Sequence, residues 1–487
     1  MTAATPPVQR RWTARQIPAA LALLTSGSAG ATDWAGDFEH LLQQLPRHYA
    51  NFEYTLSERR LDLPAIVQRE REALASAADD TQRRAAFERL LRAFADPHLR
   101  IQWAPNPAGP EAACATHRPS SGVAFHRLPG FVPLQDPAAR QFGAGVLRGE
   151  PSLGILRIGL FIERSFSAAC EQAAAKAGLD VTAPCDAACA ETLDRATVGV
   201  LNQALAGTVR QLEAAGARLL VIDVTDNAGG SDWSETVARL LAGPLRSARV
   251  SMLKHPAWAA QLSGLKKEID ALRITASGPL AERLDSARRH IDAAIPQLQQ
   301  TCDLGAAWTD VSLATGQTPL PCSNLIADRL FASGLERSGP IGRNDPVDAL
   351  LFRPAWYGSF SLSVATRPLV VLVNHETHSS AEQFTALLRD NGKARVVGIP
   401  TAGAGCGTYT DLGTTFTLPG TGAQVHAPDC VRLRSDGTNE RDGIVPDQLV
   451  PWRRSDSAWQ IAQKAARALQ PLPARNRSGR PATQAAP

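Results

Sequence analysis

A strand–turn–helix–strand pattern in the C-terminal half constrains the fold of this chain more than any other feature. Residues 369–373 form a short, valine-rich apolar run, which suits a strand buried on both faces of a parallel sheet. After a polar turn, apolar residues recur at helical spacing over residues 384–388, and residues 394–398 read as a second strand. The pattern predicts an α/β protein in which this unit lies near the centre.

Two serines, Ser379 and Ser380, lie at the junction between the first predicted strand and the predicted helix. The first N–H groups of a helix have no intrahelical partners, and the helix dipole favours negative charge beside them. A serine hydroxyl at this point can attack a carbonyl carbon while the free amides stabilise the resulting oxyanion. The alternative is that either serine only caps the helix, which the pattern by itself favours.

The same stretch resembles the nucleophile segment of the C-terminal processing peptidase and tricorn core protease family. That family shows roughly N-x-x-T-x-S-x-x-E, followed by D-x-x-R-A-x-x-x-G-x-x-T. The matching positions are Asn374, Thr377, Ser379, Glu382, Asp390, Ala394, Gly398 and Thr401. The resemblance places the nucleophile on Ser379. The lysine of the family's T-x-G-K-G is replaced by Ala404, so the base must come from elsewhere, as in the tricorn-like branch, which uses histidine.

The candidate for that base is His98, which lies in a D-P-H-L turn after the first helical segment. The turn resembles the D-G-H-T turn of the tricorn-like branch, with proline and leucine in place of glycine and threonine. A histidine at the end of a helix is otherwise usually a solvated or capping residue. His375 and His378 lie nearer to Ser379 in the sequence, but we expect them to be structural or to face the substrate.

A glycine-rich turn precedes the nucleophile segment in the order that the family shows. Residues 219–224 predict a buried strand that leads into T-D-N-A-G-G, which resembles the family's D-x-R-x-N-x-G-G turn with threonine in the arginine slot. Paired glycines let a backbone approach a ligand closely. The resemblance therefore implies an oxyanion hole made of the Gly229, Gly230 and Ser380 amides, whereas an ordinary strand-to-helix turn is the alternative.

A third motif, N-E-R-D-G-I-V-P-D at residues 439–447, resembles the tricorn-like E-G-x-G-x-x-P-D segment. There the glutamate supports the catalytic histidine, so Glu440 is expected to orient or tune His98; a surface glutamate is the alternative. The resemblance implies acyl transfer, in which Ser379 attacks, His98 takes its proton, and water hydrolyses the acyl-enzyme. It implies no metal and no cofactor.

The resemblance also implies the fold, an α/β spiral β-β-α core of the ClpP/crotonase-like kind. Helical periodicity predicts a small helical N-terminal domain over residues 32–100. Residues 101–470 would then form the serine peptidase domain, with a helical insertion at about 252–350. The Pro/Arg/Ala-rich residues 471–487 are expected to be a disordered tail.

Composition narrows the range of partners. The chain has 487 residues, of which 44% are apolar and 20% charged, as in ordinary globular proteins. Its net charge of +4 is small and no lysine or arginine block stands out, so nothing points to nucleic acid. No apolar run reaches the length of a membrane span, so stable membrane insertion is not expected. The expected partner is a peptide or protein substrate, and the oligomeric state is left open.

The N-terminus and the cysteines indicate export. Residues 1–31 resemble a weak secretory signal, although a flexible cytosolic N-terminus is the alternative. The eight cysteines show no C-x-x-C pair, which fits disulfides better than zinc. Cys406 and Cys430 flank one predicted hairpin and are the first pair to test, while Cys302 and Cys322 could close the second half of the insertion. A periplasmic or secreted location is expected.

The sequence therefore predicts a serine-type endopeptidase or tail-type peptidase that works through an acyl-enzyme. The first alternative is a non-catalytic binding protein for hydrophobic small molecules or peptides, because retinoid-binding modules of the eye share this core. An esterase is a weaker alternative, since the chain has no G-x-S-x-G elbow.

Overall fold

The structure is a computed structural model. It describes residues 32–103, 113–114, 119–181, 183, 185–326, 330–339, 346–357, 362–408, 414–453 and 455–470. The expected signal segment 1–31 and the expected tail 471–487 lie outside the described residues.

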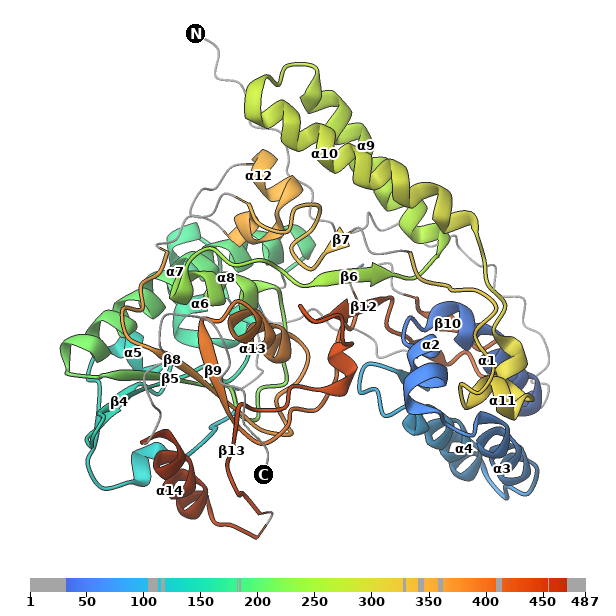
Figure 1. The fold of residues 1–487 in the computed structure, drawn as a ribbon, viewed down its shortest axis with the longest axis horizontal. Coiled ribbons are helices and arrows are strands. Elements are labelled where there is room, and N and C mark those ends of the chain that lie inside the picture. Colours follow the sequence, from blue (N-terminus) through green and yellow to red (C-terminus); the bar gives the residue numbers. More distant parts are fainter. Residues whose placement is uncertain are drawn as a thin grey trace, which may run out of the picture.

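A mixed sheet of seven strands lies on the left side of the view in Figure 1, in the order β13-β9-β8-β5-β4-β3-β2. The strands are β2 (Phe131–Pro133), β3 (Gly145–Leu147), β4 (Leu153–Arg157), β5 (Leu219–Asp223), β8 (Leu369–Val373), β9 (Ala394–Gly398) and β13 (Gln448–Leu449). The strands from β4 to β13 pair in parallel, and β2 and β3 are added antiparallel at one edge. The strands β4, β5 and β8 are buried along their whole length, and their sequences are apolar except for the charged residues that end β4 and β5.

Helices cover both faces of this sheet. On one face, Leu220 and Ile222 of β5 share a core with α7 (Ala187–Ala214), α8 (Trp233–Ala242) and α13 (Ser380–Asp390). On the other face, Leu219 and Val221 pack with α14 (Ala458–Leu469). Successive strand residues thus face opposite helical layers. The expected α/β class is confirmed, and the predicted strands at 369–373 and 394–398 match β8 and β9.

The N-terminal helices form the other end of the molecule (Figure 1). They are α1 (Trp34–His48), α2 (Phe52–Tyr54), α3 (Leu63–Ala75) and α4 (Asp80–Ala93). They share one core with α11 (Val311–Ala314) and with the small sheet of β1 (Arg100–Gln102), β11 (Gln424–His426) and β10 (Phe416–Thr417). Phe38 and Phe87 from the helices, Trp308 from the insertion and Phe416 from the C-terminal hairpin all belong to that core. The helical segment is therefore built together with distant parts of the chain.

The insertion supplies a helical hairpin and part of a third sheet. Helices α9 (Pro256–Arg273) and α10 (Gly278–Ala294) pack together and project away from the central sheet (Figure 1). Nearby, β12 (Cys430–Leu433), β6 (Arg249–Met252) and β7 (Leu330–Phe331) pair antiparallel. The remaining short helices are α5 (Pro137–Arg140), α6 (Ser167–Ala177) and α12 (Pro346–Leu351).

All eight cysteines are paired. The disulfides are Cys114–Cys170, Cys185–Cys189, Cys302–Cys322 and Cys406–Cys430. The two pairs named from the sequence, one in the insertion and one around the C-terminal hairpin, are both present. In the part of the chain that the structure describes, no helix has the length and apolar content needed to cross a bilayer.

Candidate active site

Ser379 lies at the junction between β8 and α13 in a strained backbone conformation. Its φ is 51° and its ψ is −117°, a region that residues with a side chain rarely occupy. The Ser379 amide donates to Glu382 Oε2 at 3.0 Å, and its Oγ lies 3.2 Å from His98 Nε2. The turn thus directs the serine hydroxyl at a histidine that is 281 residues away in the sequence.

Glu382 is the buried anchor of this turn. Its two carboxylate oxygens also accept hydrogen bonds from the Thr401 hydroxyl at 2.6 Å and from the Gly403 and Ala404 amides at 2.7 and 2.8 Å. One fully buried side chain therefore connects the Ser379 turn to the loop that follows β9. Because all of its partners donate, the site requires acceptor capacity at both oxygens of this side chain.

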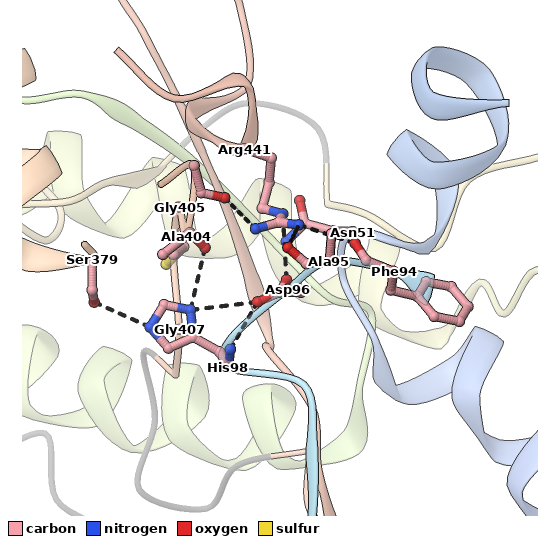
Figure 2. Close-up of polar contacts among 12 residues, drawn as sticks. Asn51, Phe94, Ala95, Asp96, His98, Ser379, Ala404, Gly405, Gly407 and Arg441 are labelled. Carbon is pink, nitrogen blue, oxygen red and sulfur yellow. Dashed lines mark hydrogen bonds and ion pairs between the residues drawn. The ribbon is translucent and has the colours of Figure 1, made fainter. Parts of the chain in front are cut away.

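The His98 ring is held from its other side by two acceptors (Figure 2). Its Nδ1 lies 3.2 Å from the Ala404 carbonyl and 3.6 Å from Asp96 Oδ1. Since both neighbours can only accept a proton, Nδ1 carries the ring proton and Nε2 is left to accept from the Ser379 hydroxyl. The backbone amide of His98 donates to the same Asp96 oxygen at 2.9 Å, which fixes the turn.

Asp96 is itself held by two donors on its second oxygen. The Tyr49 hydroxyl donates to Oδ2 at 2.9 Å, and the Arg441 guanidinium forms an ion pair with it at 3.4 Å. Burial by itself raises the pKa of Asp96, but the hydrogen bond from His98 and the charge of Arg441 outweigh it and hold that pKa below its usual value. Asp96 therefore stays a carboxylate beside the imidazole at neutral pH.

Arg441 donates hydrogen bonds to both of the loops that meet at His98. Its guanidinium donates to the Gly403 carbonyl on one loop and to the Phe94 and Ala95 carbonyls, at 3.2 and 2.8 Å, on the other. Ala95 has a φ of 49°, so the residue directly before Asp96 is also strained. Arg441 holds that strained segment in place.

Glu440 differs from the expectation that it would orient His98. It begins the short helix η7 (Glu440–Asp442), is fully buried rather than on the surface, and accepts from Arg432 Nε at 2.5 Å. Within the described residues, it makes no hydrogen bond or ion pair with His98. Burial raises the pKa of Glu440 although Arg432 opposes the shift. Strand β12 places Arg432 against Glu440, and the carboxylate at the histidine is Asp96 instead.

Arg432 connects Glu440 to the nucleophile. Its guanidinium donates to the Ser379 carbonyl at 3.3 Å, to the Gly405 carbonyl at 3.1 Å and to Gln383 Oε1 at 2.9 Å. Among the described residues, Arg432 therefore links Glu440 to the Ser379 turn.

The three residues expected to form an oxyanion hole, Gly229, Gly230 and Ser380, lie together beside Ser379. The Gly229 amide donates to Asn227 Oδ1 at 2.8 Å, so it is not free to bind an oxyanion. Gly229 instead provides space, because an added Cβ would lie 2.7 Å from Ser379 Cβ. Among the described residues, the Gly230 and Ser380 amides donate to no protein acceptor. The Ser380 hydroxyl donates to the Gly230 carbonyl at 2.7 Å, which keeps these two segments together.

Among the described residues, neither histidine next to the nucleophile in the sequence makes a hydrogen bond with Ser379. His375 and His378 both pair with Glu376, at 3.3 and 3.4 Å. The described residues also contain no cluster of three or more histidine, cysteine or acidic side chains placed to hold a metal ion.

Sequence reasoning missed Asp96, Tyr49, Arg441 and Arg432. Asp96 had a usable signal, since it begins the same D-P-H-L turn as His98. Arg441 directly follows Glu440, but nothing in the local sequence shows that it reaches toward residues 94–96.

Part of this chain is similar in sequence to known peptidases. Residues 336–450, which include Ser379 and Glu440 but not His98, match the model of peptidase family S41. A carboxyl-terminal-processing protease from Picosynechococcus sp. is 35% identical over 96 residues, which cover 20% of this chain and 22% of that protein. The chain thus matches about a fifth of that relative's length. The expected resemblance to the C-terminal processing peptidase family is confirmed.

Solved structures share the fold. Mature CPAF complexed with lactacystin aligns with a TM-score of 0.55 and 13% identity over 89% of this chain and 95% of that chain. Mature CPAF in a second structure aligns with a TM-score of 0.51 and 13% identity over 89% of this chain and 94% of that one. At this identity the likeness concerns the fold alone.

Proposed function

We propose that this protein is a serine peptidase that cleaves peptides or proteins through an acyl-enzyme, because residues 336–450 match the model of peptidase family S41. The observation that carries the proposal is the distance of 3.2 Å between Ser379 Oγ and His98 Nε2. That distance is within reach of proton transfer between a nucleophile and its general base.

In the proposed mechanism, His98 accepts the hydroxyl proton as Ser379 attacks the scissile carbonyl carbon. The imidazolium that forms keeps its Nδ1 proton between the Ala404 carbonyl and the Asp96 carboxylate, whose negative charge stabilises it. The oxyanion is bound by the free amides of Gly230, in the loop after β5, and of Ser380, the first residue of α13. His98 then gives its proton to the leaving amine, and a water molecule repeats the sequence to release the acid.

A binding protein on the same scaffold is less well supported. Such a protein needs neither a serine in a strained conformation nor a histidine held against it by a buried carboxylate. Strain of this kind persists when the surrounding structure enforces it, and it clusters at functional sites. Here Glu382, Arg432 and Asp96 together enforce the geometry of Ser379 and His98.

We also propose the domain arrangement and the compartment. Residues 32–100 would be the helical N-terminal domain and residues 101–470 the peptidase domain, with the insertion at about 252–350. Four disulfides in one chain are typical of oxidising compartments, which supports a periplasmic or secreted location.

The proposal is tested by incubating the purified protein with a denatured protein substrate and a peptide library, followed by mass spectrometry. We expect new peptide termini with the wild type and none with Ser379→Ala, which deletes one oxygen and should fold. The positions of the cuts would separate internal cleavage from trimming of C-terminal tails. Equal product formation by both proteins, or none by a folded wild type, would contradict the proposal.

A further inference from the structure

The hydroxyl group of Tyr49 connects the N-terminal helical segment to the candidate active site. Tyr49 directly follows α1 as its C-cap residue, and its side chain is buried, with 1% exposure. Its hydroxyl donates to Asp96 Oδ2, while Asp96 Oδ1 faces the His98 ring and accepts from the His98 amide. A continuous line of contacts therefore runs from Tyr49 through Asp96 and His98 to Ser379.

Burial and charge determine which group donates and which accepts in the hydrogen bond between Tyr49 and Asp96. Burial, with the neighbouring charge of Asp96 adding to it, raises the pKa of Tyr49 well above its usual value. Tyr49 is therefore a neutral phenol that can only donate toward the carboxylate at working pH. Asp96 remains ionised, as described above, so donor and acceptor do not exchange roles across the neutral pH range.

The ring of Tyr49 also supports the segment that carries Asp96. It packs edge-on against Phe94, with ring centroids 5.5 Å apart and an interplanar angle of 90°. Phe94 precedes Ala95, the residue with positive φ, and Asp96 follows directly. A strained segment keeps its shape only if its surroundings over-determine it. Tyr49 contributes to this from one side and Arg441 from the other.

We propose that Tyr49 is a positioning residue for the peptidase reaction, and that the N-terminal helices thereby complete the active site. This inference rests on the proposed function. Tyr49 touches neither substrate nor reacting atoms; it fixes the rotation of the Asp96 carboxylate so that Oδ1 faces the imidazolium. Without the hydroxyl, the carboxylate keeps its charge and its partner Arg441 but loses one of the two groups that orient Oδ2.

The test compares Tyr49→Phe with Tyr54→Phe in the full chain. Both substitutions remove one hydroxyl from the N-terminal segment, but the Tyr54 hydroxyl donates to Asp442 and not to Asp96. A tenfold change in kcat corresponds to about 1.4 kcal/mol, which is the scale of a hydrogen bond to a charged group. We expect Tyr49→Phe to lower kcat by about tenfold or more with KM unchanged within about twofold, and Tyr54→Phe to change neither by more than about twofold.

A double-mutant cycle separates positioning from a loss of folded protein. If Tyr49 acts through the Asp96 carboxylate, Tyr49→Phe should lower kcat by less than about twofold in an Asp96→Asn background. A general loss of packing would instead reduce kcat by the same factor in both backgrounds. Equal effects in the two backgrounds, or equal effects of the two tyrosine variants, would overturn the inference.

If Tyr49→Phe is unstable, NMR spectroscopy of its folded fraction still tests the inference. The proton on His98 Nδ1, held between two acceptors, should give a downfield ¹H NMR resonance from the folded fraction. It should move in Tyr49→Phe and stay in place in Tyr54→Phe; an unmoved resonance in Tyr49→Phe would count against positioning. If the wild type cleaves no substrate, the proposed function fails; if the wild type is active and Tyr49→Phe matches it, only this inference fails.

Discussion

Replacing Glu382 by glutamine should damage both the stability of the domain and the nucleophile. All four groups that contact this buried carboxylate donate hydrogen bonds to it. A glutamine offers one oxygen and one NH₂ group, so the NH₂ must face two donors. At the Oε2 position these would be the Ser379 and Ala404 amides. At the Oε1 position they would be the Gly403 amide and the Thr401 hydroxyl, which can rotate to accept.

The Oε1 position is therefore the less costly one for the NH₂ group, and it sets the expected magnitude. The Gly403 amide would lose its acceptor while buried, which costs about 1–3 kcal/mol. The two hydrogen bonds that remain on the glutamine oxygen would have a neutral acceptor instead of a charged one, which weakens each by about 1 kcal/mol. The free energy of unfolding should fall by about 3–5 kcal/mol, and the Ser379 amide should be held less firmly.

The assay combines thermal unfolding with the rate at which a fluorophosphonate probe labels the protein. Glu382→Gln should lower the melting temperature and slow labelling of the folded fraction by on the order of tenfold or more. The matched control is Glu376→Gln, because Glu376 lies in the same turn but is exposed, and it should change stability by less than about 0.5 kcal/mol. If both variants unfold and label like the wild type, the anchoring role of Glu382 is refuted.

Three further changes have definite expected outcomes. His98→Ala should lower turnover by on the order of a hundredfold or more with little change in KM, measured on a peptide ester. Replacing Cys406 and Cys430 by alanine should lower kcat, because their disulfide fixes the loop beside Ala404 to β12. Burial, aided by nearby positive groups, lowers the pKa of His48 to about 4, so its contribution to stability is complete above about pH 6.5 and should be lost as the pH falls to about 4, by up to about 3 kcal/mol.

Each of these has a control. His375→Ala should leave turnover near that of the wild type, and equal losses at both histidines would argue against His98 as the base. Removing the Cys185–Cys189 disulfide, which lies at the start of α7, should change kcat less than removing the other pair. Replacing His48 by glutamine should flatten thermal stability between about pH 4 and 6.5; an unchanged pH dependence would show that other groups cause it.

The central elements of the fold were predictable because their residues follow local periodicity. Strand β8 and helix α13 are buried in a regular way, so the apolar pattern alone marks them, and the strand–turn–helix junction that carries Ser379 follows directly. His98 came into consideration through the resemblance of its D-P-H-L turn to the D-G-H-T turn of the tricorn-like branch. The predicted disulfide around the C-terminal hairpin likewise depended on residues close in sequence.

The supporting contacts were not predictable, because they depend on side-chain directions across long sequence separations. Glu440 matches a family position, yet its carboxylate accepts a hydrogen bond from Arg432 on β12. The carboxylate beside the His98 ring is that of Asp96. Gly229 matches the turn motif, but the Asn227 side chain occupies its amide. Neither pattern nor composition could show that Tyr49, 47 residues before Asp96, donates to that carboxylate.

The central claim is that Ser379 is a nucleophile activated by His98, and covalent labelling tests it most directly. The native protein is treated with a fluorophosphonate probe, digested, and the modified residue is located by mass spectrometry. The account predicts a single modification on Ser379, absent in Ser379→Ala and much slower in His98→Ala. Modification of Ser380 in place of Ser379, or no modification of the folded wild type, would contradict it.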